Sequence, residues 1–350
     1  ILNSLAAEVS RIGEHALRWS GSGKAKGAGS LRWDQKLWPD KLRADGEVEL
    51  QSLPLALVAS LLPDVPWHAP EAARLDATLR VKSESLDRIA FDGQATLRGA
   101  SIASPLIAPE PVEGIDVEVR GHGRWFPLAR RVELESGALA LGAAAAGLAG
   151  TLEIAPDHYL FDITARLPPT SCTDAVRSIP ATLLGDMRHA RWEGKLGGGL
   201  RAHIDSRDLA ATELDFDIED RCTFTEVPLL ADLRRFREPF VHGVLESDGS
   251  TFEMETGPGT PAWTRLDDIS LFFVRAVLAH EDAGFFSHHG FSPAHIEDAL
   301  ARDLEAGHYV VGASTITMQL VKNVFLRREK TLARKIQEVL LTWWIERVMT

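Results

Sequence analysis

The sequence predicts an α+β protein in which an antiparallel β-rich region is followed by a mainly α-helical segment. From about residue 26 to about residue 255, apolar and polar residues alternate repeatedly, which turns one face of each strand toward a core and the other toward water. Between Ile269 and His280, apolar residues recur instead at helical spacing. The Gly- and Pro-rich run 257–261 separates the two patterns and marks a domain boundary.

The N-terminal part is expected to comprise a helical lead-in over 1–25 and a β-rich region with short helices over 26–256. Alternation with period two is clearest in residues 74–82, 114–120, 131–135, 159–166 and 212–219. Proline near a helix start favours short helices after Pro54 and Pro180, each followed by a strand-like run. This repeated unit resembles the AsmA-like envelope proteins, whose sheets form long grooves beside the membrane. A plain β-rich scaffold that spaces the next domain from its anchor is the alternative.

The C-terminal segment, 262–350, is expected to consist mainly of helices. After the helix over 269–280, a second is predicted to begin after Pro293, a third after Ser314, and a fourth to run from about Thr331 to the end.

Charge is unevenly distributed along the chain. The formal net charge of -12 argues against a nucleic-acid-binding protein, for which a basic excess is expected. The stretch 322–347 is an exception, with the basic residues Lys322, Arg327, Arg328, Lys330, Arg334, Lys335 and Arg347 against three glutamates. Such a basic island indicates an anionic ligand, and a solvated helix face is the alternative.

The cysteines bear on metal binding and on the redox compartment, and the first residue and the apolar runs bear on whether the chain is a fragment. Neither Cys172 nor Cys222 lies in a CxxC motif, which argues against a zinc or redox site. A Cys172–Cys222 disulfide is the expectation in an oxidising compartment, and two free thiols are the expectation in the cytosol. Residue 1 is Ile, and apolar runs such as 139–149 are too short to span a bilayer, so we expect a fragment of a longer protein.

The first candidate chemical motif is the block 281–290. Glu281 and Asp282 stand where a helix gives way to a Gly- and His-rich turn. Mutual repulsion and partial burial can raise the pKa of one of two adjacent carboxyl groups, which suits acid/base chemistry. Acidic residues at helix ends are more often simply solvated, so this block alone favours no function.

Two further blocks follow. Residues 312–320 read GASTITMQL, so Ser314 and Thr315 stand at a helix N-terminus, where free N–H groups attract phosphate; an ordinary N-cap is the alternative. Gln319 and Lys322 are three apart and share a helix face. In the block 334–338, Arg334 and Lys335 share a face with Glu338, which predicts either a cationic clamp for pyrophosphate or an intrahelical salt bridge.

The order and spacing of these blocks resemble the peptidoglycan glycosyltransferase family, the transglycosylase part of bifunctional penicillin-binding proteins and of monofunctional wall polymerases. That family's motifs read EDxxFxxHxG, GxSTITQQ and RKxxE. The chain matches them at Glu281, Asp282, Phe285, His288 and Gly290, then through GASTITMQ, and then at Arg334, Lys335 and Glu338. Met318 replaces the first glutamine of the second motif. The resemblance covers about 263–350 and implies a lysozyme-like domain that is truncated here, because a later KxxIxxxYxN-like block is not in the sequence.

The resemblance implies inverting polymerisation of lipid II into β-1,4 glycan with release of undecaprenyl pyrophosphate. Glu281 would be the general base and Glu338 the second catalytic glutamate. The positions that would contact substrate are Asp282, His288, Ser314, Thr315, Gln319, Lys322, Arg334 and Lys335. Asp282 is expected to brace the site, and His288 either to orient the turn or to contact the acceptor.

The same resemblance implies a setting at the periplasmic side of the bacterial inner membrane, with an anchor outside this chain. Expected partners are lipid II, lipid-linked glycan, the membrane surface and other wall-synthesis proteins, and Mg²⁺ or Mn²⁺ is an expected cofactor. One alternative is a non-catalytic envelope protein whose β-rich region binds lipid or a partner and whose helical segment is a remnant. A lysozyme-like hydrolase is a weaker alternative, because glycosidases also use paired carboxylates but need no pyrophosphate clamp.

Overall fold

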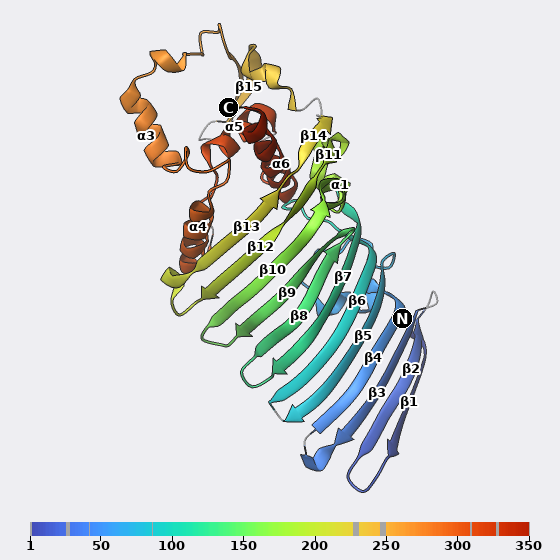
Figure 1. Cartoon of the computed structure of the whole chain (residues 1–350). Coiled ribbons are helices and arrows are strands. Elements are labelled where there is room, and N and C mark those ends of the chain that lie inside the picture. The colour runs from blue at the N-terminus through green and yellow to red at the C-terminus, as the bar shows by residue number, and fades with distance from the viewer. Residues whose placement is uncertain are drawn as a thin grey trace.

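A long, twisted antiparallel sheet carries a group of helices at one end (Figure 1). The structure is a computed structural model that describes residues 2–25, 29–41, 43–85, 87–226, 231–245, 250–308, 310–326 and 329–349. Within these residues, twelve strands form one sheet, and each pairs antiparallel with the next in chain order except that β11 is passed over. The predicted antiparallel β-rich region followed by helices is confirmed.

The strands of the large sheet are β1 (Leu2–Arg11), β2 (Leu17–Ala25), β3 (Ser30–Trp38), β4 (Arg43–Pro54), β5 (Arg74–Ser85), β6 (Arg88–Ile102), β7 (Val112–Phe126), β8 (Arg131–Leu141), β9 (Ala144–Ile154), β10 (Tyr159–Ser171), β12 (Lys195–Asp205) and β13 (Glu213–Asp220). Two small antiparallel pairs lie outside it, β11 (Arg191–Glu193) with β14 (Thr223–Glu226) and β15 (Phe240–Leu245) with β16 (Thr251–Thr256).

The helical lead-in expected over 1–25 is wrong, because its described residues form β1 and β2. Leu2, Leu5 and Val9 recur at a spacing that a helix also shows, but β1 pairs with β2 from Leu2↔Ala25 to Arg11↔Leu17. Pairing along a neighbouring strand satisfies the backbone N–H and C=O groups, and this tertiary context overrides the local pattern.

Alternation gives the large sheet one apolar and one polar face. Leu79 of β5 pairs with Gly93 of β6, and Val81 pairs with Phe91, so apolar positions line up across strands. A Cβ on Gly93 would lie 3.1 Å from Leu79 Cδ1, which means that the Leu79 side chain extends over the glycine. Leu79 nevertheless stays 43% exposed, so this face is open to solvent in part.

Short helices interrupt the β-rich region where the sequence predicts them. The turns η2 (Leu55–Leu57) and η3 (Ala59–Leu61) follow Pro54, and α2 (Ala181–Leu184) follows Pro180. The remaining short elements are η1 (Pro39–Lys41), α1 (Cys172–Arg177), η4 (Gly185–His189), η5 (Leu209–Ala211), η7 (Leu233–Phe236) and η8 (Leu266–Asp268). A disulfide joins Cys172 at the start of α1 to Cys222 before β14, with 5.8 Å between the Cα atoms.

The C-terminal helices start close to where the sequence predicts them: α3 (Leu271–Glu281), α4 (Pro293–Ala306), α5 (Ile316–Phe325) and α6 (Leu332–Val348). Their N-caps explain the boundaries. The side chains of Ser292, Thr315 and Thr331 each accept a backbone N–H from the first turn of α4, α5 and α6. No helix in the described ranges is long and apolar enough to cross a membrane.

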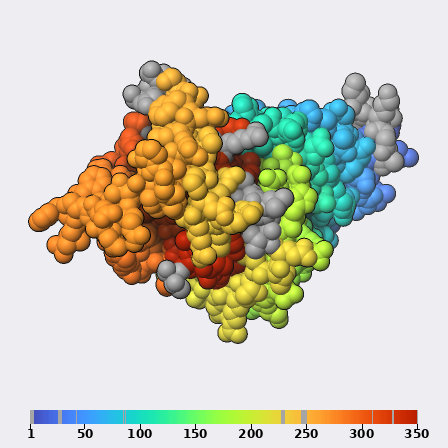
Figure 2. Space-filling model, turned by 90° about the horizontal axis from the view of Figure 1, so that it is seen from above, coloured from blue at the N-terminus to red at the C-terminus, as the bar shows by residue number. Residues whose placement is uncertain are grey.

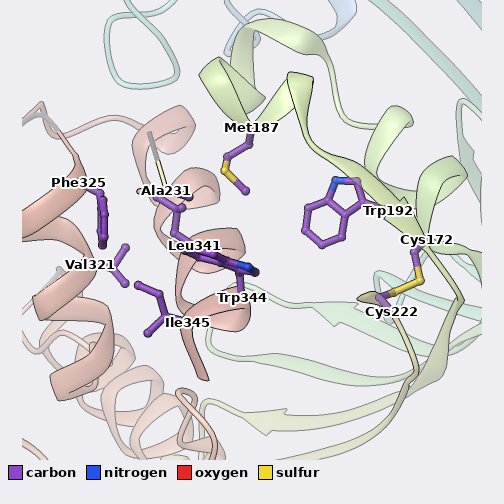
Figure 3. Close-up of a cluster of buried hydrophobic side chains, with 10 residues drawn as sticks. All are labelled: Cys172, Met187, Trp192, Cys222, Ala231, Val321, Phe325, Leu341, Trp344 and Ile345. Carbon is purple, nitrogen blue, oxygen red and sulfur yellow. A yellow bond between two sulfur atoms is a disulfide. The ribbon is translucent and has the colours of Figure 1, made fainter. Parts of the chain in front are cut away.

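The main hydrophobic core joins the two predicted regions (Figure 3). Its buried members are Cys172, Met187, Trp192, Cys222 and Ala231 on one side and Val321, Phe325, Leu341, Trp344 and Ile345 of α5 and α6 on the other. Seen from above, the red C-terminal residues lie between the orange residues of the α3 segment and the yellow-green residues of the β-rich region (Figure 2). Helix α6 therefore packs against the β-rich region as well as against its own segment.

Candidate active site

Asp282 connects the first sequence block to the second. It is the residue after α3, and its carboxyl group is fully buried. His288 Nε2 donates to it at 2.9 Å from Oδ1, and the backbone N–H of Ile316, at the start of α5, donates to Oδ2 at 3.1 Å. A carboxylate at a helix N-terminus satisfies an otherwise unpaired N–H and interacts favourably with the helix dipole. Asp282 is thus bonded through both carboxylate oxygens and fixes the turn against α5.

Glu281 is the more accessible carboxylate of the pair. Its side chain is 41% exposed, and Gln319 Nε2, one turn into α5, donates to Oε2 at 2.8 Å. His280 lies 4.0 Å from the other oxygen. Because Gln319 bonds one oxygen and the side chain is partly exposed, Glu281 is oriented and still open to a ligand.

The start of α5 is fitted against the first block. Thr315 is fully buried; its hydroxyl donates to the carbonyl of Gly290 at 2.7 Å and accepts the N–H of Met318 at 3.3 Å. That hydroxyl hydrogen is therefore already used within the protein, and Thr315 acts here as a cap that locks the turn. Met318, which departs from the family motif, is buried in the protein interior.

The third block forms a buried charge cluster on α6. Glu338 is 2% exposed, and it accepts from Lys335 Nζ at 2.7 Å and from Arg334 Nη1. Lys335 Nζ also donates to Ser314 Oγ at 3.0 Å. Two cations around one carboxylate leave a net positive charge beside the N-terminus of α5. Such an arrangement favours a doubly charged anion such as a phosphate group.

Contacts between distant parts of the chain bring the three blocks together. Glu281 bonds to Gln319 across 38 residues, and Lys335 bonds to Ser314 across 21 residues, so the acid and the cations both attach to the beginning of α5. Lys322 is less connected: among the described residues it makes no recorded hydrogen bond or ion pair. Arg327 and Arg328 of the predicted basic island lie outside the described residues.

A cavity of about 410 Å³ lies beside Arg334, between α6 and η4. It is lined in part by Arg334 and Gln337 of α6 and by Gly185 and Arg188 of η4, and Glu281 does not line it. A single groove with Glu281 on one wall and the cations on the other therefore stays a prediction.

Sequence reasoning missed how tightly the first block packs on α6. Gly290 has φ +82°, and a Cβ there would lie 2.7 Å from Glu346 Cγ and 2.9 Å from Thr342 Cγ2. Glu346 is held in turn by the hydroxyl of Thr317, which donates to Oε1 at 2.5 Å. The glycine after two histidines could have indicated a left-handed turn, but no local signal indicates its neighbour on α6.

The described residues offer no cluster of three or more His, Cys, Asp or Glu side chains that could hold a metal ion. Both oxygens of Glu338 accept from cations, so a divalent ion there would face Arg334 and Lys335. These residues do not fit a resident metal in this arrangement.

Comparisons with known proteins cover the C-terminal part of the chain. The family model described as Transglycosylase matches residues 249–350. The biosynthetic peptidoglycan transglycosylase of Acinetobacter baumannii is 48% identical over 86 residues, which are 25% of this chain and 38% of that protein. Proteins of the same name from Methylobacillus flagellatus and Cupriavidus metallidurans are 42% identical over 88 residues and 43% identical over 95 residues, covering 25% and 27% of this chain and 38% and 41% of theirs. The chain thus spans about two fifths of the length of these relatives, and no solved structure matches it.

Proposed function

Residues 249–350 belong to the transglycosylase family, and from this premise we propose that the intact protein is a peptidoglycan glycosyltransferase. It would polymerise lipid II into β-1,4 glycan strands by inverting transfer, with release of undecaprenyl pyrophosphate. The observation that carries the proposal is the attachment of both the Glu281 carboxylate and the Arg334–Lys335–Glu338 cluster to the beginning of α5.

Glu281 is the proposed general base. Its carboxylate is partly exposed at the end of α3 and is oriented by Gln319, so it can reach the acceptor's 4-hydroxyl and take its proton. General-base catalysis of this kind contributes about 10² to 10⁴ in rate. Asp282 and His288 hold the turn that carries Glu281, and their role in this proposal is to position it.

The cation cluster is the proposed site of the leaving pyrophosphate. Negative charge develops on the leaving group as the glycosidic bond breaks, and preorganised donors at that point stabilise the transition state. Lys335 and Arg334 supply such donors beside the start of α5. Glu338 orients both cations, and Ser314 holds Lys335 against the helix. Lys322, on the same helix as Gln319, would add a further cation.

The proposed location is the periplasmic face of the bacterial inner membrane, because the substrates keep their lipid tails in the bilayer. The exposed apolar side chains of the α3 segment support this. Helix α3, all of which is described, has no buried residue; Leu271, Phe272 and Phe273 are exposed at its start, and Phe286 is exposed in the turn that follows Glu281. Exposed apolar clusters of this kind mark membrane or partner contacts. An anchor outside this chain, wall-synthesis partners and a requirement for Mg²⁺ or Mn²⁺ stay predictions.

Replacement of Glu281 by glutamine in the intact protein tests the base. We expect loss of about 10² to 10⁴ in glycan polymerisation from lipid II, because glutamine keeps the side-chain shape and the contact with Gln319 but cannot take a proton. The matched control is Glu305→Gln on the exposed side of α4, which should polymerise at the wild-type rate. Wild-type activity in Glu281→Gln would remove Glu281 from the mechanism.

A second candidate function follows from the open apolar face of the large sheet. Leu79, Val119 and Ile218 are 43%, 40% and 66% exposed, which fits the alternative of an envelope protein whose β-rich region binds lipid. Under that alternative, the intact protein binds lipid vesicles while neither it nor Glu281→Gln makes glycan.

A further inference from the structure

Helix α6 is attached to the β-rich region at its N-terminal end. The backbone N–H groups of Leu332 and Ala333 donate to the carbonyls of Leu106 and Ile107, both at 2.9 Å. The first N–H groups of a helix have no partner within the helix, so these bonds satisfy them and fix where α6 begins. Arg334 and Lys335 follow directly.

The C-terminal half of α6 is attached through Asp220, the last residue of β13. Trp343 Nε1 donates to Asp220 Oδ2, and Arg347 Nη2 donates to the same oxygen at 2.6 Å. The guanidinium of Arg347 also lies 4.2 Å from the centre of the Trp343 ring. The Asp220 side chain is only 14% exposed, so little water competes for these charge-assisted bonds.

The other oxygen of Asp220 connects α6 to the disulfide. Oδ1 accepts the backbone N–H of Cys222 at 2.9 Å, and Cys222 is bonded to Cys172 at the start of α1. Trp192, in the same core, stacks on Trp343 with centroids 4.9 Å apart and an interplanar angle of 21°. Asp220 therefore joins α6 to the most cross-linked part of the β-rich region.

The side of α6 that is bonded to Asp220 is opposite the side that carries Glu338. At 3.6 residues per turn, about 100° per residue, Trp343 and Arg347 lie roughly 140° to 180° around the helix from Glu338. Because Trp343 and Arg347 are both bonded to Asp220, α6 cannot rotate or slide without breaking these bonds. Lys335 Nζ reaches Ser314 at 3.0 Å, so a shift of about 1 Å would break that contact as well.

From this geometry we propose that Asp220 is a positioning residue of the glycosyltransferase: it holds α6 so that Arg334 and Lys335 meet the pyrophosphate of the lipid substrate. The β-rich region is then a structural part of the catalytic centre, and its role is more than that of a spacer. The proposal rests on the proposed function, because it assigns a task within that reaction.

Asp220→Ala in the intact protein is the test. Misplacement of catalytic groups by about 1 Å costs up to about 100-fold, so we expect kcat for lipid II polymerisation to fall about 10- to 100-fold with little change in KM. Loss of interactions made in the transition state produces this split, provided that kcat is calculated per folded molecule, because a smaller folded fraction lowers the apparent kcat in the same way. Asp220→Asn keeps the shape and an acceptor oxygen, so it should stay folded and recover part of kcat.

The control is Asp217→Ala, an exposed carboxylate on the same strand, which should match the wild type. Binding of inorganic pyrophosphate, measured by calorimetry, is the second readout, and Asp220→Ala should weaken it about 10-fold. Unchanged kcat and unchanged pyrophosphate affinity in folded Asp220→Ala would overturn the positioning role.

The two readouts separate the positioning role from the proposed function. A wild type that binds pyrophosphate but makes no glycan contradicts the proposed function alone, provided that Asp220→Ala still weakens the binding. A wild type that neither binds pyrophosphate nor makes glycan contradicts both.

Discussion

Replacing Gly290 by alanine tests whether the first block is fitted directly against α6. Gly290 is buried, has φ +82°, and leaves no room for a side chain, because a Cβ would lie 2.7 Å from Glu346 Cγ and 2.9 Å from Thr342 Cγ2. Thr342 is fully buried, and Glu346 is bonded to Thr317, so neither neighbour is free to move aside.

The expected loss of stability has two parts. Left-handed backbone costs a residue with a Cβ about 1–2 kcal/mol, and forcing a methyl group into a packed interior costs about 1–3 kcal/mol. Together they predict that Gly290→Ala lowers the free energy of unfolding by about 2–5 kcal/mol. Gly307, at the end of α4, has φ +69° but nothing within 4 Å of a Cβ, so Gly307→Ala should show only the first part.

Urea unfolding followed by tryptophan fluorescence measures both variants, because Trp344 of α6 is buried in the shared core. The difference between the two losses reports the contact with α6 and should be about 1–3 kcal/mol. Equal losses in the two variants would refute the close packing of the block on α6.

Glu338→Gln should lower the free energy of unfolding by about 1–3 kcal/mol in urea unfolding, less than for a fully buried pair, because the cations beside it reach solvent; Glu305→Gln should leave it unchanged. The pKa of Asp303 is lowered from its ordinary 3.8 by the backbone N–H groups of Val310 and Val311, which donate at 2.7 and 2.9 Å. A lowered pKa in the folded state means that this attachment is at full strength above pH 3.8 and is lost as the pH falls through the lower value. Hydrogen exchange at Val310 and Val311 should therefore rise between pH 5 and pH 2 after correction for intrinsic rates, and Asp303→Asn should abolish that step; the same step in the variant would contradict the assignment.

The helices of the C-terminal segment could be predicted because their signals are local. Ser292 before Pro293, Thr315 and Thr331 each cap the helix that follows, and caps act within a few residues. The prediction of a helix over 1–25 was wrong because the conformation there depends on pairing between strands, which is not a local signal. Leu5 and Val9 are 62% and 66% exposed on β1, so the strand is held by pairing with β2 and its apolar residues contribute little to a core.

The candidate site was predictable in its chemistry and less so in its contacts. The spacing of Arg334, Lys335 and Glu338 predicted that they share a helix face, and the ion pairs confirm this. The same kind of reasoning named Thr315 as a donor to substrate, a role that stays untested, while the structure shows its hydroxyl bonded to Gly290. Whether a polar group is free for a ligand depends on neighbours that sequence spacing does not specify.

The sequence by itself determined the alternating sheet, the capped helices and the three chemical blocks, because periodicity, caps and motif spacing all act over short stretches of chain. Only the tertiary structure decided that Trp343 and Arg347 of α6 are bonded to the end of β13. These bonds join Asp220 to Trp343 and Arg347 across 123 and 127 residues. Contacts over such separations arise from how whole elements pack. Sequence spacing can predict that residues share a helix face, but it does not predict which residues that face, or the opposite face, will contact.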